Sequence, residues 1–452
     1  MRGRIFKGAV LASAAAIALT ACGGDDTPNT APSPGATGGG GGDKCEPFKA
    51  YGDLKGKTVT IYSGIVTPED KPHIESYKPF EECTGATVKY TADKTFETQI
   101  LVRAKAGNPP DLAIVPQPGL LQQLVATGKA VEAPAGVTSN VDKHWTKEWK
   151  AYATVGGKFY GAPLGASVKS LVWYSPAEFQ EKGVQPPKTL DELYQISDKL
   201  AEGNRKPWCA GVASGEATGW PITDWMEDMM LRLSGPEEYD KWVKHEIPFN
   251  SEGPTAALEE AGKILKNDKY VNGGLGNVKS IASTTFQDGG LSILEGSCSL
   301  HRQASFYAAN WPKGTKVAED GDVFAFYFPP IDPSKGKPVL VAGEFVSAFA
   351  DRDEVVKVQT YLASAEWANS RAKLGDWVSA NKGLDASAVV NPIDKLSVQI
   401  LQDPATVARF DGSDLMPAQV GAKSFWTGMT DWINGTKDTK ATLDFIEGTW
   451  PK

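Results

Sequence analysis

The chain has few of the residues that build metal or redox centres. Its 452 residues include only four histidines and five cysteines. They contain neither a Cys-x-x-Cys nor a His-x-x-x-His pair of the kind that zinc sites use. The four histidines are scattered, so each is expected to be a surface or packing residue: His73, His144, His245 and His301. The sequence therefore predicts no metal site and no cofactor.

An excess of positive charge and long apolar runs are also missing. The formal net charge is −8, which argues against nucleic acid or an anionic membrane surface as a partner. Beyond the N-terminal segment, no stretch is long and apolar enough for a membrane-spanning helix. We find no internal repeat, and no low-complexity segment beyond the one near the N-terminus.

The N-terminus carries an export signal. Arg2, Arg4 and Lys7 precede an apolar run at residues 9–19, which is too short to span a bilayer as a stable helix. The sequence LTAC follows at residues 19–22 and is similar to the lipobox of bacterial lipoproteins. Residues 1–21 are thus predicted to be a lipoprotein signal peptide and Cys22 the lipidated first residue. The alternative is an ordinary secretory signal followed by a chance cysteine.

Residues 22–44 are predicted to be a lipidated, flexible tether. The stretch GGDDTPNTAPSPGATGGGGGD at residues 23–43 has no large apolar side chain, so it cannot bury enough surface to offset the entropy of ordering. Loss of the three basic residues of the signal peptide moves the net charge from −8 to −11. The expected location is the extracellular face of the cell membrane, held by the lipid anchor.

Four cysteines remain, and an exported chain meets oxidising conditions that favour disulfides. Three pairings are possible. Proximity in the sequence favours Cys45 with Cys83, which holds the N-terminus down, and Cys209 with Cys298, which joins two middle segments.

Strand and helix patterns alternate after the tether. The strands expected at residues 58–63, 87–91 and 111–115 are each followed by a helical pattern, at 67–83, 96–106 and 118–127. This order predicts an α/β fold with a mainly parallel sheet, whose ligands lie beyond the carboxyl ends of the strands, near Ser63-Gly64 and residues 116–118. Further strands are expected at 170–174, 322–328 and 339–349, and further helices from Thr189 and at 254–265 and 354–374. The chain beyond the tether, about 410 residues, is too long for one hydrophobic core, so two lobes are expected.

Several segments stand together in one order: PPDLAIVPQPGLL, GGKFYGAPLGASVKSLVWYSP, PPKTLDELYQISDKL, GEATGWPITDW, DGGLSILEGSCSLHR, EFVSAF and KSFWTGMTDWINGT. The set resembles the extracellular solute-binding proteins of bacterial ABC sugar importers, in the maltose and α-glucoside branch. The resemblance implies a two-lobed α/β fold of the periplasmic-binding-protein type, with a ligand cleft between the lobes and a hinge of three crossings. It implies an N-terminal lobe of residues 45–166 plus 327–366 and a C-terminal lobe of residues 167–326 plus 367–452.

The segment GEATGWPITDW, at residues 215–225, has the composition of a sugar site. Flat aromatic rings cover the C–H faces of a sugar, and carboxylates accept hydrogen bonds from its hydroxyls. Trp220 and Trp225 are therefore stacking candidates, one of which is free to pack in the core instead because residues five apart share no helix face. Similarity to the maltose pattern assigns Glu216 to the hydroxyls, whereas Asp224 is expected to cap a helix through residues 226–233.

Six further residues are predicted to contact ligand, and each has a plain alternative in packing or solvation. They are Gln117 at a strand tip, Lys169 beside an apolar strand, Arg302 after Cys298, Glu344 inside an apolar strand, Trp377 in a glycine-started loop and Trp426 where the family places a stacking tryptophan. The loop after residue 115 lacks the Trp and the Asp-Arg pair of the maltose pattern, so the contacts of the first lobe are not carried over.

The predicted function is the binding subunit of an ABC transporter that captures an α-linked di- or oligosaccharide, such as maltose, trehalose or sucrose. It is not an enzyme, and it delivers the sugar to a membrane permease as a monomer. One alternative is the same fold with a different small solute, such as a polyamine, iron or phosphate. The other is a secreted glycoside hydrolase, for which Glu216 and Glu344 are the conceivable carboxylate pair.

Overall fold

The computed structural model describes residues 44–273 and 276–451. The predicted signal peptide and nearly all of the predicted tether, including Cys22, lie outside these residues. Within the described part, no helix is both long enough and apolar enough to cross a membrane.

One mixed sheet carries the first half of the α/β pattern. Its strand order is β13-β12-β3-β1-β2, and β6 also pairs with β12. The three expected strands form and lie parallel, with β1 between β2 and β3. The strands of this sheet are β1 (Thr58–Ser63), β2 (Thr87–Ala92), β3 (Leu112–Val115), β6 (Gly161–Val168), β12 (Lys337–Ala348) and β13 (Thr406–Phe410).

A second sheet has the order β11-β7-β10-β8-β9. Its strands are β7 (Leu171–Tyr174), β8 (Trp208–Cys209), β9 (Val271–Asn272), β10 (Leu300–Arg302) and β11 (Phe324–Tyr327). A small hairpin pairs β4 (Thr154–Val155) with β5 (Lys158–Phe159). Each large sheet supports a hydrophobic core, so the chain folds into two α/β lobes, as predicted.

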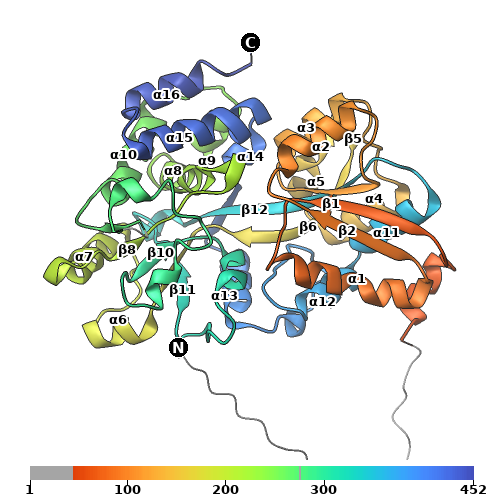
Figure 1. The fold of residues 1–452 in the computed structure, drawn as a ribbon, viewed down its shortest axis with the longest axis horizontal. Helices are drawn as coiled ribbons and strands as arrows, with labels where there is room; N and C mark the ends of the chain where they lie inside the picture. Colours follow the sequence, from red (N-terminus) through yellow and green to blue (C-terminus); the bar gives the residue numbers. More distant parts are fainter. Residues whose placement is uncertain (1–43, 274–275, 452) are drawn as a thin grey trace, which may run out of the picture. The chain divides into compact units, whose positions relative to one another are not determined.

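Helices surround both sheets. In the first lobe α1 and α11 pack against β2 and β1, and in the second α8 packs against α10, α15 and β12 (Figure 1). The helices are α1 (Asp70–Thr84), α2 (Phe96–Lys105), α3 (Pro118–Ala126), α4 (Ala135–His144), α5 (Lys147–Tyr152), α6 (Pro176–Lys182), α7 (Leu190–Leu200), α8 (Trp220–Leu233), α9 (Gly235–Val243), α10 (Glu252–Leu265), α11 (Asp353–Leu362), α12 (Ala365–Ala372), α13 (Pro392–Gln402), α14 (Gly412–Leu415), α15 (Phe425–Asn434) and α16 (Thr439–Glu447).

The chain passes between the sheets at strand ends. β6 belongs to the first sheet and β7, three residues later, to the second. β12 follows β11 of the second sheet and then pairs with β13, β6 and β3 of the first. Lys169 and Ser170 form the short link between β6 and β7, which places them where the two lobes meet.

Two local predictions were wrong. The helix expected at residues 354–374 is two helices, because Ser364 interrupts it and its hydroxyl accepts from the backbone N–H of Trp367 to start α12. The helix expected at residues 226–233 begins earlier, at Trp220, so Asp224 lies inside α8 rather than at its N-cap. Pro221 near the helix start and Gly219 before it supply the earlier start signal.

Both disulfides of the favoured pairing are present. Cys45 bonds to Cys83 with a Cα–Cα distance of 5.2 Å, which fixes the described N-terminus to the end of α1. Cys209 bonds to Cys298 with a Cα–Cα distance of 5.6 Å, which joins the end of β8 to the segment before β10.

Candidate ligand-binding site

A cavity of about 220 Å³ lies where the two lobes meet. The first lobe contributes the residues after β1 and β3, and the second contributes the start of α8 and part of α15. Ser63, Gly64, Pro116 and Gln117 line it, so the carboxyl ends of β1 and β3 do face the cavity, as the α/β pattern predicts.

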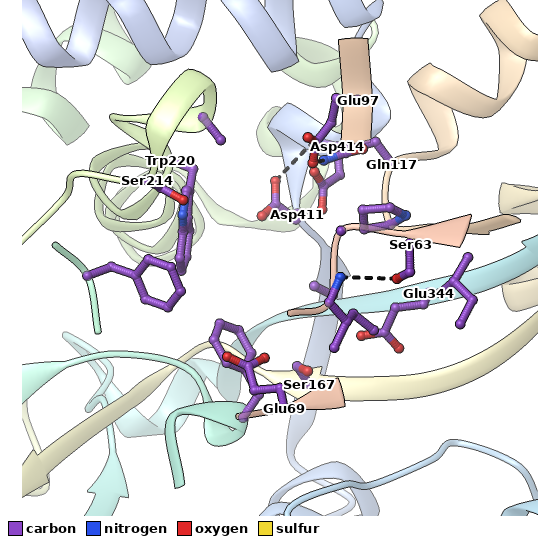
Figure 2. Close-up of a pocket in the computed structure, with 18 of the residues that line it drawn as sticks. Ser63, Glu69, Glu97, Gln117, Ser167, Ser214, Trp220, Glu344, Asp411 and Asp414 are labelled. Atoms are coloured by element: carbon purple, nitrogen blue, oxygen red, sulfur yellow. Dashed lines mark hydrogen bonds between the residues drawn. The ribbon is translucent and has the colours of Figure 1, made fainter. Parts of the chain in front are cut away.

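The wall of the cavity combines aromatic and carboxyl side chains. Figure 2 shows the Trp220 ring on one side and Ser63 with Glu344 on the other. Glu97, Gln117 and Asp414 lie at one end of the cavity, and Glu69 and Ser167 lie at the other (Figure 2).

Trp220 is half-buried at the N-terminus of α8, where Phe286 and Phe306 fix its ring with centroid separations of 5.1 and 6.1 Å. The residue before it is Gly219, with a φ of 110°. A Cβ atom there would lie 2.2 Å from the backbone oxygen of Trp426, so only glycine allows α8 to start against α15. This close approach brings both tryptophans to one wall of the cavity.

Lys169 lies beside the Trp220 ring in a buried ion cluster. Its Nζ atom is 5.1 Å from the ring centroid, 2.8 Å from Oδ1 of Asp224, and also bonded to Asp411. Burial by itself would lower the pKa of Lys169, but the carboxylates of Asp224 and Asp411 raise it well above its ordinary value. Lys169 therefore stays charged and lies against the Trp220 ring. Both of its carboxylate partners are buried.

Asp224, Glu227 and Asp411 form a group of three carboxylates within 4.8 Å of one another. Such a group suits a cation, and the Lys169 ammonium already supplies one. Glu227 accepts the backbone N–H groups of Gly412 and Ser413 at 2.9 and 3.0 Å. Burial raises the pKa of Glu227 well above its usual range, which further reduces the negative charge of the group. We therefore assign no metal here.

The predicted ligand contact of Arg302 does not agree with its position in the structure. Its guanidinium is buried and donates to Asp228, with Nε at 3.1 Å from Oδ2, and to the backbone oxygen of Asp224 at 2.9 Å. Arg232 donates to the same Asp228 at 2.7 Å. The guanidinium groups are satisfied inside the second lobe, so Arg302 stabilises that lobe and does not reach the cavity.

Trp225, predicted as a stacking residue for the ligand, lies in the core instead. Its ring packs against Trp208 and Phe328 with centroid separations of 5.4 and 5.5 Å, inside the core of the second lobe. α8 turns Trp220 to the cavity and Trp225 away from it, because residues five apart point to different faces of a helix. Glu216 is exposed on a short turn before α8 and is not a lining residue; its contact with ligand stays a prediction.

Other predicted residues do line cavities. The main cavity is lined by Gln117, Lys169, Glu344 and Trp426. An adjoining cavity is lined by Trp377. Two buried polar atoms of the main wall, Oε1 of Gln117 and Nε1 of Trp426, have no hydrogen-bond partner within the described chain. Such atoms mark positions for ligand hydrogen bonds, because leaving them unpaired is costly.

Besides Asp411 and Asp414, sequence reasoning missed two further carboxyl groups of the wall, Glu69 and Glu97. Burial raises the pKa of Glu69 to about 7, with added repulsion from Glu344, and burial also raises the pKa of Glu97. Asn310 donates to Glu69 at 3.2 Å. Both acids stand at the starts of the helices that follow β1 and β2, so the strand-end rule that pointed to Ser63 was a signal for them as well.

Comparison with known proteins agrees with this geometry. Residues 64–369 match the family described as bacterial extracellular solute-binding protein. The chain is 42% identical to the alpha-glucosides-binding periplasmic protein AglE of Rhizobium meliloti (strain 1021), over 89% of this chain and 88% of AglE. It is 39% identical to the osmoprotective compounds-binding protein GgtB of Synechocystis sp., over 90% of this chain and 96% of GgtB.

A solved structure shares the fold. The bacterial solute receptor AcbH, described as preferring β-D-galactopyranose, superposes with a TM-score of 0.73 at 21% identity. The match covers 87% of this chain and 98% of AcbH.

Proposed function

This chain belongs to the bacterial extracellular solute-binding proteins and is the solute-binding component of an ABC sugar transporter, and from this premise we propose its ligand. The ligand is an α-linked di- or oligosaccharide, an α-glucoside such as maltose, trehalose or sucrose. The protein captures it outside the cell and delivers it to the membrane permease. It works as a monomer and performs no chemistry on the sugar.

The wall of the main cavity is the observation that carries this proposal. An indole ring on one side and carboxyl groups on the other match the C–H face and the hydroxyls of one sugar ring (Figure 2). The name of AglE, the relative with 42% identity, supports the α-glucoside class. GgtB and AcbH are described with other solutes, so the class needs a direct test.

Titration calorimetry with one panel tests the ligand class. We expect binding of at least one of maltose, trehalose and sucrose, and none of putrescine, ferric ion or phosphate. Binding of a probe from the second group alone would contradict the proposal. Thermal melts give an independent reading, since a ligand at 100 times its Kd stabilises the folded state by about 2.7 kcal/mol.

The carboxylate pair named for the hydrolase alternative, Glu216 and Glu344, does not stand across the cavity. Glu344 lines the cavity, but Glu216 is exposed outside it, whereas a hydrolase holds two carboxyl groups on either side of the bond that is cleaved. The relatives are binding proteins rather than enzymes. Release of glucose from maltose during a long incubation would overturn this assignment.

A further inference from the structure

A second, smaller cavity of about 130 Å³ adjoins the first. The two share Glu69, Ser167, Phe306 and Glu344 among their lining residues, so they lie directly beside each other. The wall of the second cavity adds His73 of α1, Arg371 of α12, Asp394 of α13, and Asp376 and Trp377 from the loop between α12 and α13.

Arg371 is a buried cation without an ion pair. Its residue is 2% exposed, and no carboxylate oxygen of the described chain lies within 4.0 Å of its guanidinium. Nη1 donates to the backbone oxygen of Gly375 at 2.8 Å, whereas Nε has no acceptor among the described residues. Burial lowers the pKa of Arg371 to about 10, so it is still protonated at neutral pH. A buried guanidinium in this state requires further acceptors.

Trp377 presents a second buried donor. The residue is 8% exposed, and its Nε1 atom has no acceptor within the described chain. A Cβ atom at Gly165 would lie 2.6 Å from that nitrogen and 2.6 Å from Oε2 of Glu344. The absence of a side chain at Gly165 therefore allows this donor and this acceptor to lie close to each other, although they do not bond to each other.

The remaining wall supplies acceptors. Asp394 accepts the backbone N–H of Trp377 at 3.3 Å, and Asp376 accepts from the side chain of Asn391 at 2.8 Å. With Glu344 and Glu69, four carboxyl groups line the cavity that also holds Arg371.

This mixture of groups selects a ligand chemistry. An anion would face four carboxyl groups, and a cation would face Arg371. An apolar group would leave Nε of Arg371 and Nε1 of Trp377 unpaired. A hydroxyl group donates and accepts at once, so hydroxyls satisfy both sets of partners.

We propose that the second cavity is a binding compartment for the second unit of a disaccharide, whose first ring lies in the main cavity beside Trp220. Arg371 and Trp377 donate to hydroxyls of that second unit, and Glu344, at the junction, contacts both units. This inference rests on the proposed function and adds residues and a ligand length to it.

Calorimetry with ligands of two lengths tests the compartment. Trp377→Phe keeps the ring and removes the N–H, and Arg371→Lys keeps the charge and removes the Nε donor. We expect each variant to bind maltose, trehalose or sucrose at least tenfold more weakly than the wild type. Methyl α-glucoside fills only the main cavity, so its affinity should change by less than about twofold, a small fraction of the ~1.4 kcal/mol that a tenfold change represents.

Trp145→Phe is the matched control. Trp145 is also buried with an unpartnered Nε1, but it lines neither cavity. Trp377→Phe should lose disaccharide affinity relative to this control while melting at a similar temperature. If Arg371→Lys fails to fold, Trp377→Phe decides alone.

The outcomes separate this inference from the proposed function. Disaccharide affinities equal to those of Trp145→Phe, or equal losses for one-ring and two-ring ligands, overturn the compartment and leave the α-glucoside assignment standing. A wild-type protein that binds no α-glucoside overturns the assignment itself.

Discussion

Trp220 is the residue proposed to stack on the ligand in the main cavity. It is half-buried, and its ring lies against Phe286 and Phe306 without filling the core. Its neighbour five positions on, Trp225, has the same chemistry but packs against Trp208. Identical residue types in one short segment thus serve recognition and packing, and helix geometry decides between them.

Replacing Trp220 with alanine should weaken binding of the α-glucoside ligand. Loss of one stacked aromatic face removes about 2 kcal/mol, which corresponds to roughly a 30-fold rise in Kd. Trp220→Phe retains a flat ring and should recover most of the affinity. Calorimetry measures both variants, and wild-type affinity for Trp220→Ala would show that the ring does not contact ligand.

Glu69 makes stability depend on pH. Burial raises its pKa from the model-compound value of 4.5 to about 7 in the folded protein, so between these two values the folded state holds a proton that the unfolded state has lost. Stability should therefore be highest below about pH 4.5 as far as this group is concerned, and should fall as the pH rises through 7. Glu69→Gln should flatten this part of the profile of unfolding free energy against pH.

The control for that measurement is Glu75→Gln, on the exposed face of the same helix α1. It should leave the slope of the profile between pH 4.5 and 7 unchanged. If Glu69→Gln shows the wild-type slope as well, the buried carboxyl of Glu69 is not the group that titrates.

Among the elements, the segments that follow β6 and β13 meet through one ion pair. Lys169 stands directly after β6 and Asp411 directly after β13. The backbone N–H of Lys169 donates to the carbonyl oxygen of Leu340 in β12, and that of Asp411 donates to the carbonyl oxygen of Val341. The Lys169 ammonium pairs with the carboxylate of Asp411 and with that of Asp224 on α8. Three elements that meet below the cavity are therefore linked by a single buried cation.

Lys169→Met should destabilise the protein by about 3–5 kcal/mol in urea unfolding, because it leaves Asp224 and Asp411 buried without their cation. Adding Asp411→Asn should restore part of this loss, since it removes one of the uncompensated charges. Lys440→Met is the control, as it breaks the exposed pair with Asp444 on α16 and should change little. A Lys169→Met protein as stable as the wild type would show that the pair does not join these elements.

Element patterns were also where sequence reasoning succeeded. β1, β2, β3 and α2 lie within one or two residues of their predicted positions, and α7 starts after Thr189 with Glu192 as its capping partner. These elements have local signals: β-branched strands, caps and glycine stops. β6, in contrast, lacks such a pattern, because GAPLGASV is small-residue sequence that is fully buried by its pairing with β12.

For the molecule as a whole, anchoring to the membrane is the remaining prediction. A lipid on Cys22 should keep the protein with the cell membrane, and Cys22→Ser should release it into the medium or periplasm. Fractionation of cells that express each form measures this, with Gly23→Ser as the neighbouring control. Retention of Cys22→Ser in the membrane fraction would contradict the anchor.

The sequence by itself predicted the α/β class, the two lobes and the disulfide pairing that locality favoured, because these follow from length, periodicity and spacing along the chain. The export signal stays a prediction. Only the tertiary structure decided which polar residues face the cavity. Arg302 and Glu344 both stand in strands, yet Arg302 meets Asp228 from another element and is satisfied, whereas Glu344 lines both cavities. Whether a buried charge is paired depends on side chains far away in the sequence, which local patterns do not record.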